Sequence, residues 1–420
     1  MFSEVRQQEI YQLVREQKKV KVSQLAKQFN VTLETIRNDL KVLESQGLIN
    51  RVHGGAVLGK QEIKKMSKFS EDFDISCLLR DLLIKNEEAK DNSIRVYEGK
   101  VCILGSFIID IIANVDHFPK VGELIYSNSN ALSPGGKGTN QALSASCSGS
   151  RVHLITKVGN DPFNKYAYKH LKESGIDSFT IFQSDTEPTG SSVTYLAEET
   201  KNNITASYFG ANSTFIEQEI DTSLPYISES DVFLVQGEVN IDAIERAVKF
   251  AHEIGKDVIL NVAPYSEELK RLYRFVDYIT LNMYQSGEWA GIKVNDIQSA
   301  KEAAKIVAGE ERKKVIINLD GLGVVYFDGK ISHHIAALPS ITVDTMGSCD
   351  AFNGAFASEI AKGKPINEAV LFANAFVSAF IEQKGVTRMP NISNVLARLK
   401  FSKTNNIKQN YFCSETRCEI

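Results

Sequence analysis

The stretch Asp344–Glu359, Asp-Thr-Met-Gly-Ser-Cys-Asp-Ala-Phe-Asn-Gly-Ala-Phe-Ala-Ser-Glu, decides how the rest of the chain is interpreted. A strand-like apolar run ends at Val343, a turn of small residues follows, and a helix is expected from Ala351 onward. The first amides of a helix have no partner inside it and lie at the positive end of its dipole, which favours binding of an anion. We therefore expect an anion-binding site here, formed by the amides of Gly347, Ser348 and Cys349.

Asp350 lies at the start of the same predicted helix. A carboxylate beside amides that bind an anion suits a base that accepts a proton from a group attacking that anion. Phosphoryl transfer needs this arrangement, because it requires a positioned acceptor hydroxyl and neutralisation of the transferred charge. We predict that Asp350 is the general base of a phosphotransferase, and that Gly347, Ser348 and Cys349 complete the catalytic site.

Two separated motifs resemble the signatures of the ribokinase family of sugar and nucleoside kinases, the PfkB family. Residues 344–350 are similar to its C-terminal signature, Asp-Thr-x-Gly-Ala-Gly-Asp, with Cys349 in place of the second glycine. The N-terminal signature is present upstream as Gly-Gly-Lys-Gly-Thr-Asn-Gln-Ala at 135–142. The resemblance implies a ribokinase-like α/β domain with a small β-sheet lid, which uses ATP and Mg²⁺ to phosphorylate a sugar or a nucleoside.

The resemblance also implies a substrate site with two walls. Asp110, which follows the first predicted strand of this domain, would hold sugar hydroxyls, since a carboxylate can accept hydrogen bonds from neighbouring hydroxyls. Taken without the resemblance, Asp110 would more simply cap a helix after the strand. The opposite wall is expected from Gly135, Gly136, Lys137, Asn140 and Glu238, where the glycines let the backbone approach the ligand.

Nucleotide-binding residues follow from the same resemblance. They are Asn282 after a predicted strand, the loop residues Asn318, Gly321 and Gly323, and Asn374 on a helix near the C-terminus. Asp344 resembles a residue that helps to bind a monovalent cation, K⁺, and it is also placed to cap the following turn.

Two residues depart from the family pattern. Gln285 stands where the family has a glutamate that orients Mg²⁺-bound water, and a neutral side chain should attract a hard divalent cation less strongly. Cys349 keeps its backbone N–H but adds a Cβ and a sulfur, and a positive φ there would cost about 1–2 kcal/mol. Its thiol, at a helix N-terminus, is expected to have a lowered pKa, unless Cys349 is simply a tolerated small residue.

Composition sets the class of protein. The 420 residues are too many for one ordinary domain, and 43% hydrophobic with 24% charged residues is typical of a globular protein. The N-terminus lacks the apolar core of a signal peptide, and no apolar run approaches the length of a membrane span. The six cysteines show neither CxxC pairs nor metal-ligand spacing, so we expect a cytoplasmic protein.

The N-terminal segment differs in charge from the rest. Although the net charge is −4, residues 1–57 carry nine Lys or Arg against six acids. Helical spacing is found at 3–17, a helix capped by Ser23 is expected at 23–29, and Thr32 can cap a third helix. The apolar stripe of this third helix is Ile36, Leu40 and Leu43. Residues 47–56 then indicate a β-hairpin wing.

This order resembles the winged helix-turn-helix of DeoR-type bacterial regulators, whose pattern matches Thr-Ile-Arg-Asn-Asp-Leu at 35–40 and Arg-Val-His-Gly-Gly-Ala at 51–56. The resemblance implies operator DNA as a partner and dimers on paired half-sites, so we expect a homo-oligomer. The residues implied to contact DNA are Thr35, Arg37, Asn38, Lys41, Arg51 and His53. The alternative is a three-helix oligomerisation module with a solvated charged face.

The chain is expected to divide into a winged helix at 1–57, a linker at 58–98 with one short helix at 75–84, a kinase domain at 99–400 and a tail at 401–420. Within 99–400, strand-like runs alternate with helices, which indicates a parallel sheet with helices on both faces. These runs lie at 152–156, 232–235, 258–262, 278–281 and 315–318. Runs at 124–128, 191–196 and 204–209 alternate like the antiparallel strands of a lid.

Three hypotheses about function remain open. The first is a protein with two functions, an operator-binding winged helix and a sugar kinase whose substrate changes the affinity for DNA. The second is a regulator whose kinase domain binds a sugar without turnover, which Gln285 and Cys349 would allow. The third is a metabolic kinase whose N-terminal module only mediates assembly. The intact base, sugar wall and anion site favour the first.

Overall fold

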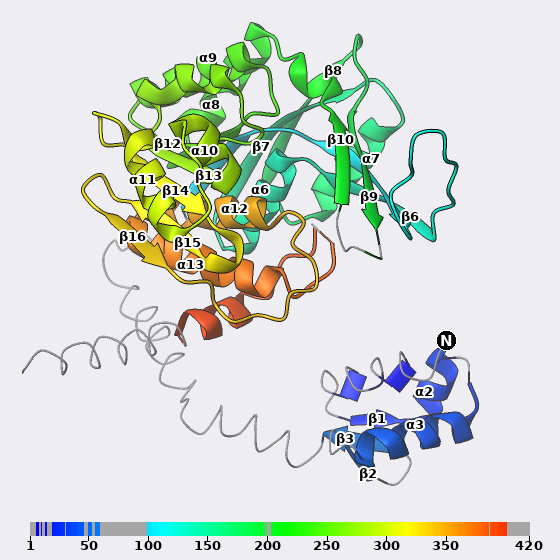
Figure 1. Ribbon diagram of the computed structural model, residues 1–420. Coiled ribbons are helices and arrows are strands. Elements are labelled where there is room, and N and C mark those ends of the chain that lie inside the picture. Colours follow the sequence, from blue (N-terminus) through cyan, green and yellow to red (C-terminus); the bar gives the residue numbers. More distant parts are fainter. Residues whose placement is uncertain are drawn as a thin grey trace, which may run out of the picture. The chain divides into compact units, whose positions relative to one another are not determined.

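The computed structural model describes residues 6–7, 10, 13–14, 19–29, 31–45, 49–52, 55–58, 99–197, 199, 203–385 and 387–400. The chain forms two compact units, Met1–Val96 and Tyr97–Ile420 (Figure 1). Of the linker expected at 58–98, only Leu58 is among the described residues. Residues 59–98 and the tail expected at 401–420 lie outside them. Among the helices described, none is both long and apolar enough to span a membrane.

The N-terminal unit combines helices with a three-stranded sheet in the order β1-β3-β2 (Figure 1). Its elements are β1 (Lys19–Lys21), α2 (Val22–Phe29), α3 (Leu33–Ser45), β2 (Ile49–Val52) and β3 (Gly55–Leu58), preceded by helical residues at 6–7, 10 and 13–14. The predicted hairpin wing is confirmed as β2 and β3, and β1 adds a strand that the sequence did not predict.

The apolar stripe predicted for the third helix forms the core of this unit. Ile36, Leu40 and Leu43 are buried with Ile10 and Leu25 from the preceding helices. The predicted cap at Thr32 is confirmed, because its hydroxyl accepts a hydrogen bond from the amide of Thr35 at 3.1 Å. The predicted cap at Ser23 is wrong: α2 already begins at Val22, directly after β1.

The larger unit is built on a nine-stranded sheet in the order β16-β15-β14-β13-β12-β11-β4-β7-β8 (Figure 1). Neighbouring strands from β14 to β8 run parallel, and β15 and β16 are antiparallel at one edge. The strands are β4 (Lys100–Leu104), β7 (Arg151–Gly159), β8 (Ser178–Ser184), β11 (Val232–Gln236), β12 (Asp257–Asn261), β13 (Tyr278–Asn282), β14 (Lys314–Asn318), β15 (Val324–Phe327) and β16 (Ser332–Ile335). The prediction of a parallel sheet is confirmed.

Helices cover both faces of this sheet, as the continuous burial of its central strands requires. One face is covered by α6 (Lys137–Cys147), α12 (Ser348–Ala361) and α13 (Ile366–Phe380), and the other by α8 (Glu217–Ser228), α9 (Ile241–Glu253), α10 (Met283–Ala290) and α11 (Ile297–Ala308). Helix α7 (Phe163–Glu173) packs on β7 and β8, and short 3₁₀ helices lie at Gly210–Ser213, Glu267–Phe275 and Asp320–Leu322. Helix α12 is buried along its whole length from Asp350 to Ala361, between α6 and α13.

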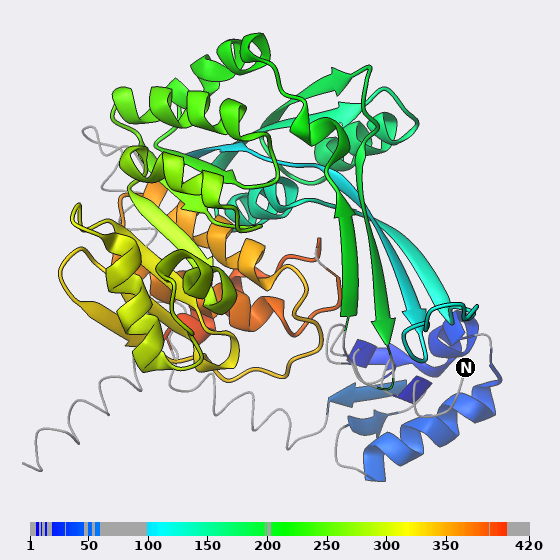
Figure 2. The same ribbon diagram turned by 45° about the horizontal axis from the view of Figure 1, so that its top comes forward.

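A second, four-stranded sheet in the order β10-β9-β5-β6 extends away from the main sheet (Figure 2). Its strands are β5 (Ile108–Val115), β6 (Ser129–Gly135), β9 (Gly190–Ala197) and β10 (Asn203–Tyr208). This is the predicted lid, although its central pair β5 and β9 is parallel.

Two strand predictions are wrong. Residues 124–128 form no strand, and β6 begins only at Ser129. The apolar run before Asp344 also forms no strand, and both Ile341 and Val343 are exposed. In both places apolar alternation occurs without a neighbouring strand to pair with, and pairing is what makes a strand.

Candidate active site and nucleic-acid interface

The centre of the main sheet contains the point at which the chain reverses its direction of strand addition. Strands β4 and β11 are neighbours at this point. The strand that follows β4 in the main sheet, β7, lies beside β4 on one side, and the strand that follows β11, β12, lies beside β11 on the opposite side. Ligands of open α/β sheets bind in the crevice at the carboxyl ends of such strands. Ser106 follows β4 and Glu238 follows β11, and a hydrogen bond from the Ser106 hydroxyl to the Glu238 carboxylate joins them.

A cavity of about 750 Å³ lies at this edge, between the main sheet and the lid. It brings together most of the residues predicted to bind substrate and to catalyse the reaction. Those that line it are Asp110, Gly136, Lys137, Asn140, Glu238, Gly347 and Asp350, and Asp344, the predicted cation ligand, lines it as well.

The carboxylate of Asp350 is buried at the base of this cavity, in the first turn of α12. Its Oδ2 accepts a hydrogen bond from Asn140 Nδ2 at 3.3 Å, and its Oδ1 accepts one from Gln141 Nε2 at 3.1 Å. The ammonium group of Lys137 lies 3.9 Å from Oδ1. All three partners belong to the first turns of α6, so the N-terminal motif orients the aspartate of the C-terminal motif.

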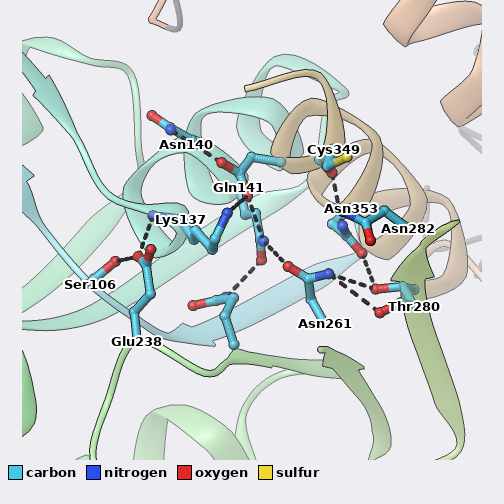
Figure 3. A network of polar contacts seen from close by, with 12 residues as sticks. Ser106, Lys137, Asn140, Gln141, Glu238, Asn261, Thr280, Asn282, Cys349 and Asn353 are labelled. Carbon is cyan, nitrogen blue, oxygen red and sulfur yellow. Dashed lines mark hydrogen bonds and ion pairs between the residues drawn. The ribbon is translucent and has the colours of Figure 1, made fainter. Parts of the chain in front are cut away.

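Lys137 and Glu238 link the walls of the cavity electrostatically. The negative charges of Asp350 and Glu238 raise the pKa of Lys137, so it is protonated at neutral pH. Burial raises the pKa of Glu238, although Lys137 and the Ser106 hydrogen bond oppose this change. The Glu238 carboxylate also accepts the backbone N–H of Lys137 at 3.0 Å, which fixes the start of α6 (Figure 3).

Asp110 is a residue of strand β5, so the alternative role of a helix cap is wrong. Its carboxylate accepts a hydrogen bond from the hydroxyl of Ser192, its register partner on β9. Burial raises the pKa of Asp110. A Cβ at Gly135 would lie 2.0 Å from Asp110 Oδ2, so a larger residue there would displace this carboxylate.

The N-terminus of α12 carries free amides beside Asp350. Within the described chain, the N–H groups of Gly347, Cys349 and Asp350 make no intramolecular hydrogen bond, whereas that of Ser348 donates to the carbonyl of Thr345 at 3.1 Å. Of the three amides predicted to bind an anion, those of Gly347 and Cys349 are therefore free, whereas that of Ser348 is used in the turn and the free amide of Asp350 lies beside them. Gly347 has φ 78°, a left-handed conformation that favours glycine and lets the turn enter the helix.

Cys349 adopts an ordinary helical conformation, since positive φ among the described non-glycine residues is confined to Arg312 and Asp320. The predicted lowering of its pKa is wrong: burial, with a contribution from the charge of Asp350, raises the pKa of this thiol to about 11. Desolvation of the thiolate outweighs the opposing positive charge of Lys137. The structure thus supports the simpler interpretation of a tolerated small residue.

The predicted nucleotide residues are only partly brought together. Asn318, Gly323 and Asn374 line a crevice of about 50 Å³ that Ser348 and Cys349 border from the other side. Gly321 and Asn282 do not line it. The amide of Asn374 donates to the carbonyl of Ala336 at 2.8 Å, so it also ties α13 to the chain after β16.

Gln285 and Asp344 make local hydrogen bonds that explain their positions. Gln285 Oε1 accepts the N–H of Asn282, and Asn282 Oδ1 accepts the N–H of Gln285, both at 2.8 Å, which is a capping box at the start of α10. Asp344 Oδ1 accepts the N–H of Met346 at 2.9 Å, as the predicted cap requires, and its Oδ2 accepts that of Gly385 at 3.0 Å.

Comparison with known proteins agrees with this geometry. Residues 98–392 match the family model described as pfkB family carbohydrate kinase. The chain belongs to this family. The ribokinase of Haemophilus influenzae is 31% identical to it over 283 residues, which cover 67% of this chain and 92% of that protein. The ribokinase of Bacillus subtilis is 29% identical over 301 residues, which cover 71% and 99%.

Solved structures of carbohydrate kinases share the fold of the larger unit. The ribokinase of Thermotoga maritima superposes with a TM-score of 0.64 at 28% identity, covering 71% of this chain and 99% of that one. Arabidopsis thaliana ribokinase complexed with ribose and ATP also gives a TM-score of 0.64, at 25% identity, and covers 72% and 99%.

The N-terminal unit of this pfkB-family chain is a DeoR-like helix-turn-helix domain, the family model of which matches residues 6–62. The side chains of Arg37, Asn38 and Lys41 are exposed on α3, and Thr35 is half-buried. Arg51 is exposed on the wing, where its guanidinium pairs with Glu44 at 2.8 Å. His53 lies outside the described residues.

Sequence reasoning missed three polar residues of the kinase site. Ser106 and Ser192 position Glu238 and Asp110, but single serines in strands and turns give no distinguishing signal. Gln141 lies inside the N-terminal motif, and the helical spacing of that motif could have placed it one turn after Lys137, facing the same way.

Proposed function

We propose that the kinase domain transfers the γ-phosphate of ATP to a hydroxyl of a sugar, with Asp350 as the general base. The observation that carries this proposal is the position of a buried carboxylate directly beside three free amides at a helix N-terminus. The carboxylate can accept a proton while the amides neutralise the charge that develops on the transferred phosphate.

In this mechanism the sugar is held by Asp110, Asn140 and Glu238. Asn140 Oδ1 is buried and accepts no hydrogen bond within the described chain, so it is free to accept one from a sugar hydroxyl. As the hydroxyl gives its proton to Asp350, its oxygen bonds to the γ-phosphorus, and the bond from that phosphorus to the β-phosphate oxygen breaks. ADP leaves, and Lys137 balances negative charge throughout.

The nucleotide would lie along the crevice formed by Asn318, Gly323 and Asn374, which places its phosphates toward Cys349 and the amides of α12. Mg²⁺ would neutralise phosphate charge. The described residues contain no group of three or more His, Cys, Asp or Glu that could hold a metal ion, and Gln285 already uses its side-chain oxygen in the cap of α10. We infer that Mg²⁺ enters with ATP rather than with a protein site.

Ribose and 2-deoxyribose are the first substrates to test, because relatives of this chain are named ribokinase and deoxyribokinase. K⁺ near Asp344 is a further proposal. Both oxygens of Asp344 already accept backbone N–H groups, so a cation there would use their remaining lone pairs.

We further propose that the DeoR-like domain binds operator DNA through Thr35, Arg37, Asn38, Lys41, Arg51 and His53, and that sugar occupancy changes its affinity.

A second copy of the chain would occupy the second half-site of a paired operator. The outer face of the lid offers a surface for such a contact, since it exposes apolar side chains on neighbouring strands. They are Ile111, Leu132, Val193, Ile204 and Tyr208. Light scattering coupled to size exclusion tests this, and a DNA-binding monomer would contradict it.

A regulator without turnover is the second candidate function. Gln285 favours it, because this neutral side chain is engaged in a local cap where the family pattern has a carboxylate.

One experiment distinguishes the two functions. ADP formation is measured for wild type and Asp350→Asn with a panel of sugars and nucleosides, and thermal shift reports binding in parallel. Turnover by the wild type that falls by about 10²–10⁴-fold in the variant supports the kinase. Stabilisation by a sugar without ADP formation supports the regulator.

A further inference from the structure

A network of buried amide side chains lies beneath the active site, across the carboxyl ends of three central strands (Figure 3). Gln141 of α6 is fully buried at its centre. Its Oε1 accepts Gln236 Nε2 from the end of β11 at 2.7 Å, and its Nε2 donates to Asn261 Oδ1 at the end of β12 at 3.0 Å. The same Nε2 donates its second proton to Asp350 Oδ1 at 3.1 Å.

From Asn261 the network returns to the helix that carries Asp350. Asn261 Nδ2 donates to the hydroxyl of Thr280 at 3.2 Å, and this hydroxyl donates to Asn353 Oδ1. Asn353 Nδ2 then donates to the carbonyl of Cys349 at 2.8 Å. Helix α12 is thus held to the network twice, at the Asp350 carboxylate and at the side chain of Asn353, which in turn bonds within the helix to the carbonyl of Cys349.

The direction of each hydrogen bond in this network is determined by its neighbours. Because Oε1 of Gln141 accepts from Gln236, its NH₂ group must face Asn261 and Asp350. Both protons of that NH₂ group are used, so the amide has no alternative orientation without leaving a buried donor unsatisfied, which would cost about 1–3 kcal/mol.

We propose that Gln141 is a positioning residue for the catalytic base. It directs Oδ1 of Asp350 toward the protein interior and leaves Oδ2, which accepts only the Asn140 amide within the described chain, for the substrate hydroxyl. The inference rests on the proposed function, in which Asp350 is the base. Side chains at the ends of β11, β12 and β13 hold Gln141 in place, so the ionised form and the orientation of the Asp350 carboxylate depend on these strands as well as on the active-site loops.

Two substitutions remove the donated hydrogen bond at different structural cost. Gln141→Met keeps the side chain's length and loses all polar atoms. Gln141→Glu retains an acceptor for Gln236 but places a second negative charge beside Asp350. The matched control is Ser358→Ala. Like Gln141, Ser358 is buried and hydrogen-bonded, in its case to Ser150 at 2.7 Å. It lies on α12, two turns beyond Asp350, and so does not contact the carboxylate.

The ionisation of Asp350 is the decisive measurement. The aspartate carboxyls are labelled with ¹³C, and the Asp350 resonance is assigned by its absence in Asp350→Asn. We expect the resonance to titrate at a higher pH in Gln141→Met than in the wild type, and at a still higher pH in Gln141→Glu, because the charged form loses a donor or gains a like charge. The other groups that face Asp350 are Lys137, Asp110, Glu238 and the Cys349 thiol, and they are unchanged in all variants.

Turnover gives a second readout. The acid limb of the kcat profile should move upward in the same order, and kcat at neutral pH should fall by about 10–100-fold while KM for the sugar changes little. Ser358→Ala should lower the melting temperature without moving either titration.

The two proposals fail in different ways. A wild type that turns over no substrate contradicts the proposed kinase, yet the carboxyl titration still tests the role of Gln141. If the Asp350 resonance titrates at the same pH in the wild type and in both Gln141 variants, Gln141 has a merely structural role and this inference is overturned. That holds whether or not the melting temperature falls.

Discussion

Cys349 is the residue at which the chain departs from the glycine of the family's C-terminal signature, and its surroundings explain why the change is tolerated. Its φ is not positive, so a Cβ causes no backbone strain. Its amide is free for an anion, as a glycine's would be. Burial keeps the thiol protonated at neutral pH, with a pKa of about 11, so the residue adds no charge beside the amides that we propose to bind the transferred phosphate.

This protonation state predicts an unusual pH dependence of alkylation. Only the thiolate reacts with iodoacetamide, so the reaction of Cys349 should be slow at pH 8 and should still be accelerating at pH 10. The measurement is mass spectrometry of the Cys349 peptide after timed alkylation, with a free cysteine peptide as the reference. A rate that levels off below pH 9 would show that the helix terminus, and not burial, controls this thiol.

Ser192 offers a test of the sugar wall. Its hydroxyl donates to the Asp110 carboxylate, so Ser192→Ala should raise the pKa of Asp110 further and remove one constraint on its direction. We expect KM for the sugar to rise about tenfold, with the larger loss at acidic pH, where Asp110 becomes protonated and accepts fewer hydrogen bonds. Ser207→Ala, on the neighbouring strand of the same cavity, serves as the control. Equal effects of the two variants would contradict a specific role for Ser192.

At the scale of elements, a buried ion pair joins helix α3 of the N-terminal unit to the residues that precede it. The guanidinium of Arg6 contacts the Asp39 carboxylate at 2.6 Å, and Gln7 donates to the same carboxylate at 2.9 Å. The pair attaches the helical residues at 6–7 to the helix that exposes Arg37 and Lys41. A buried carboxylate that loses its cation is left uncompensated.

Arg6→Met should therefore destabilise this unit by about 3–5 kcal/mol. Hydrogen exchange of the α3 amides in the full chain is the measurement, and exchange in α12 should stay unchanged because it belongs to the other unit. Glu34→Gln is the control, since the exposed pair of Glu34 with Arg37 contributes little. Equal protection of α3 in wild type and Arg6→Met would show that apolar packing alone holds the helix.

The elements differ in how far the sequence could predict them. Buried parallel strands such as β11 and β14 have continuous apolar runs, and the two glycine-containing motifs predicted where the cavity would form. Residues 124–128 and 341–343 have the same apolar character but no partner strand, and pairing is a tertiary property that local pattern does not contain. The amide network around Gln141 was equally hidden, because its partners come from three strands and two helices far apart in sequence.

At the scale of the whole molecule, the fusion of a DeoR-like domain to a pfkB-family kinase predicts a measurable coupling between two ligands. A sugar can change the affinity for DNA only if it binds unequally to two states of the chain. By thermodynamic linkage, DNA must then change the affinity for the sugar by the same factor. Asp350→Asn is the suitable background, because it keeps the lid residues and, under the proposed mechanism, removes the general base.

The operator is first selected from random DNA with the full chain, and its dissociation constant is measured by fluorescence anisotropy at fixed salt, since phosphate contacts make affinity strongly salt-dependent. We expect saturating sugar to change this constant by about 5–150-fold, and saturating operator to change sugar affinity by the same factor in calorimetry. Asp110→Ala should abolish the effect of sugar while leaving DNA binding intact, because Asp110 lines the proposed sugar site and does not belong to the N-terminal unit. Independent binding of the two ligands, with both affinities unchanged, would mean that the domains share a chain without sharing a regulatory mechanism.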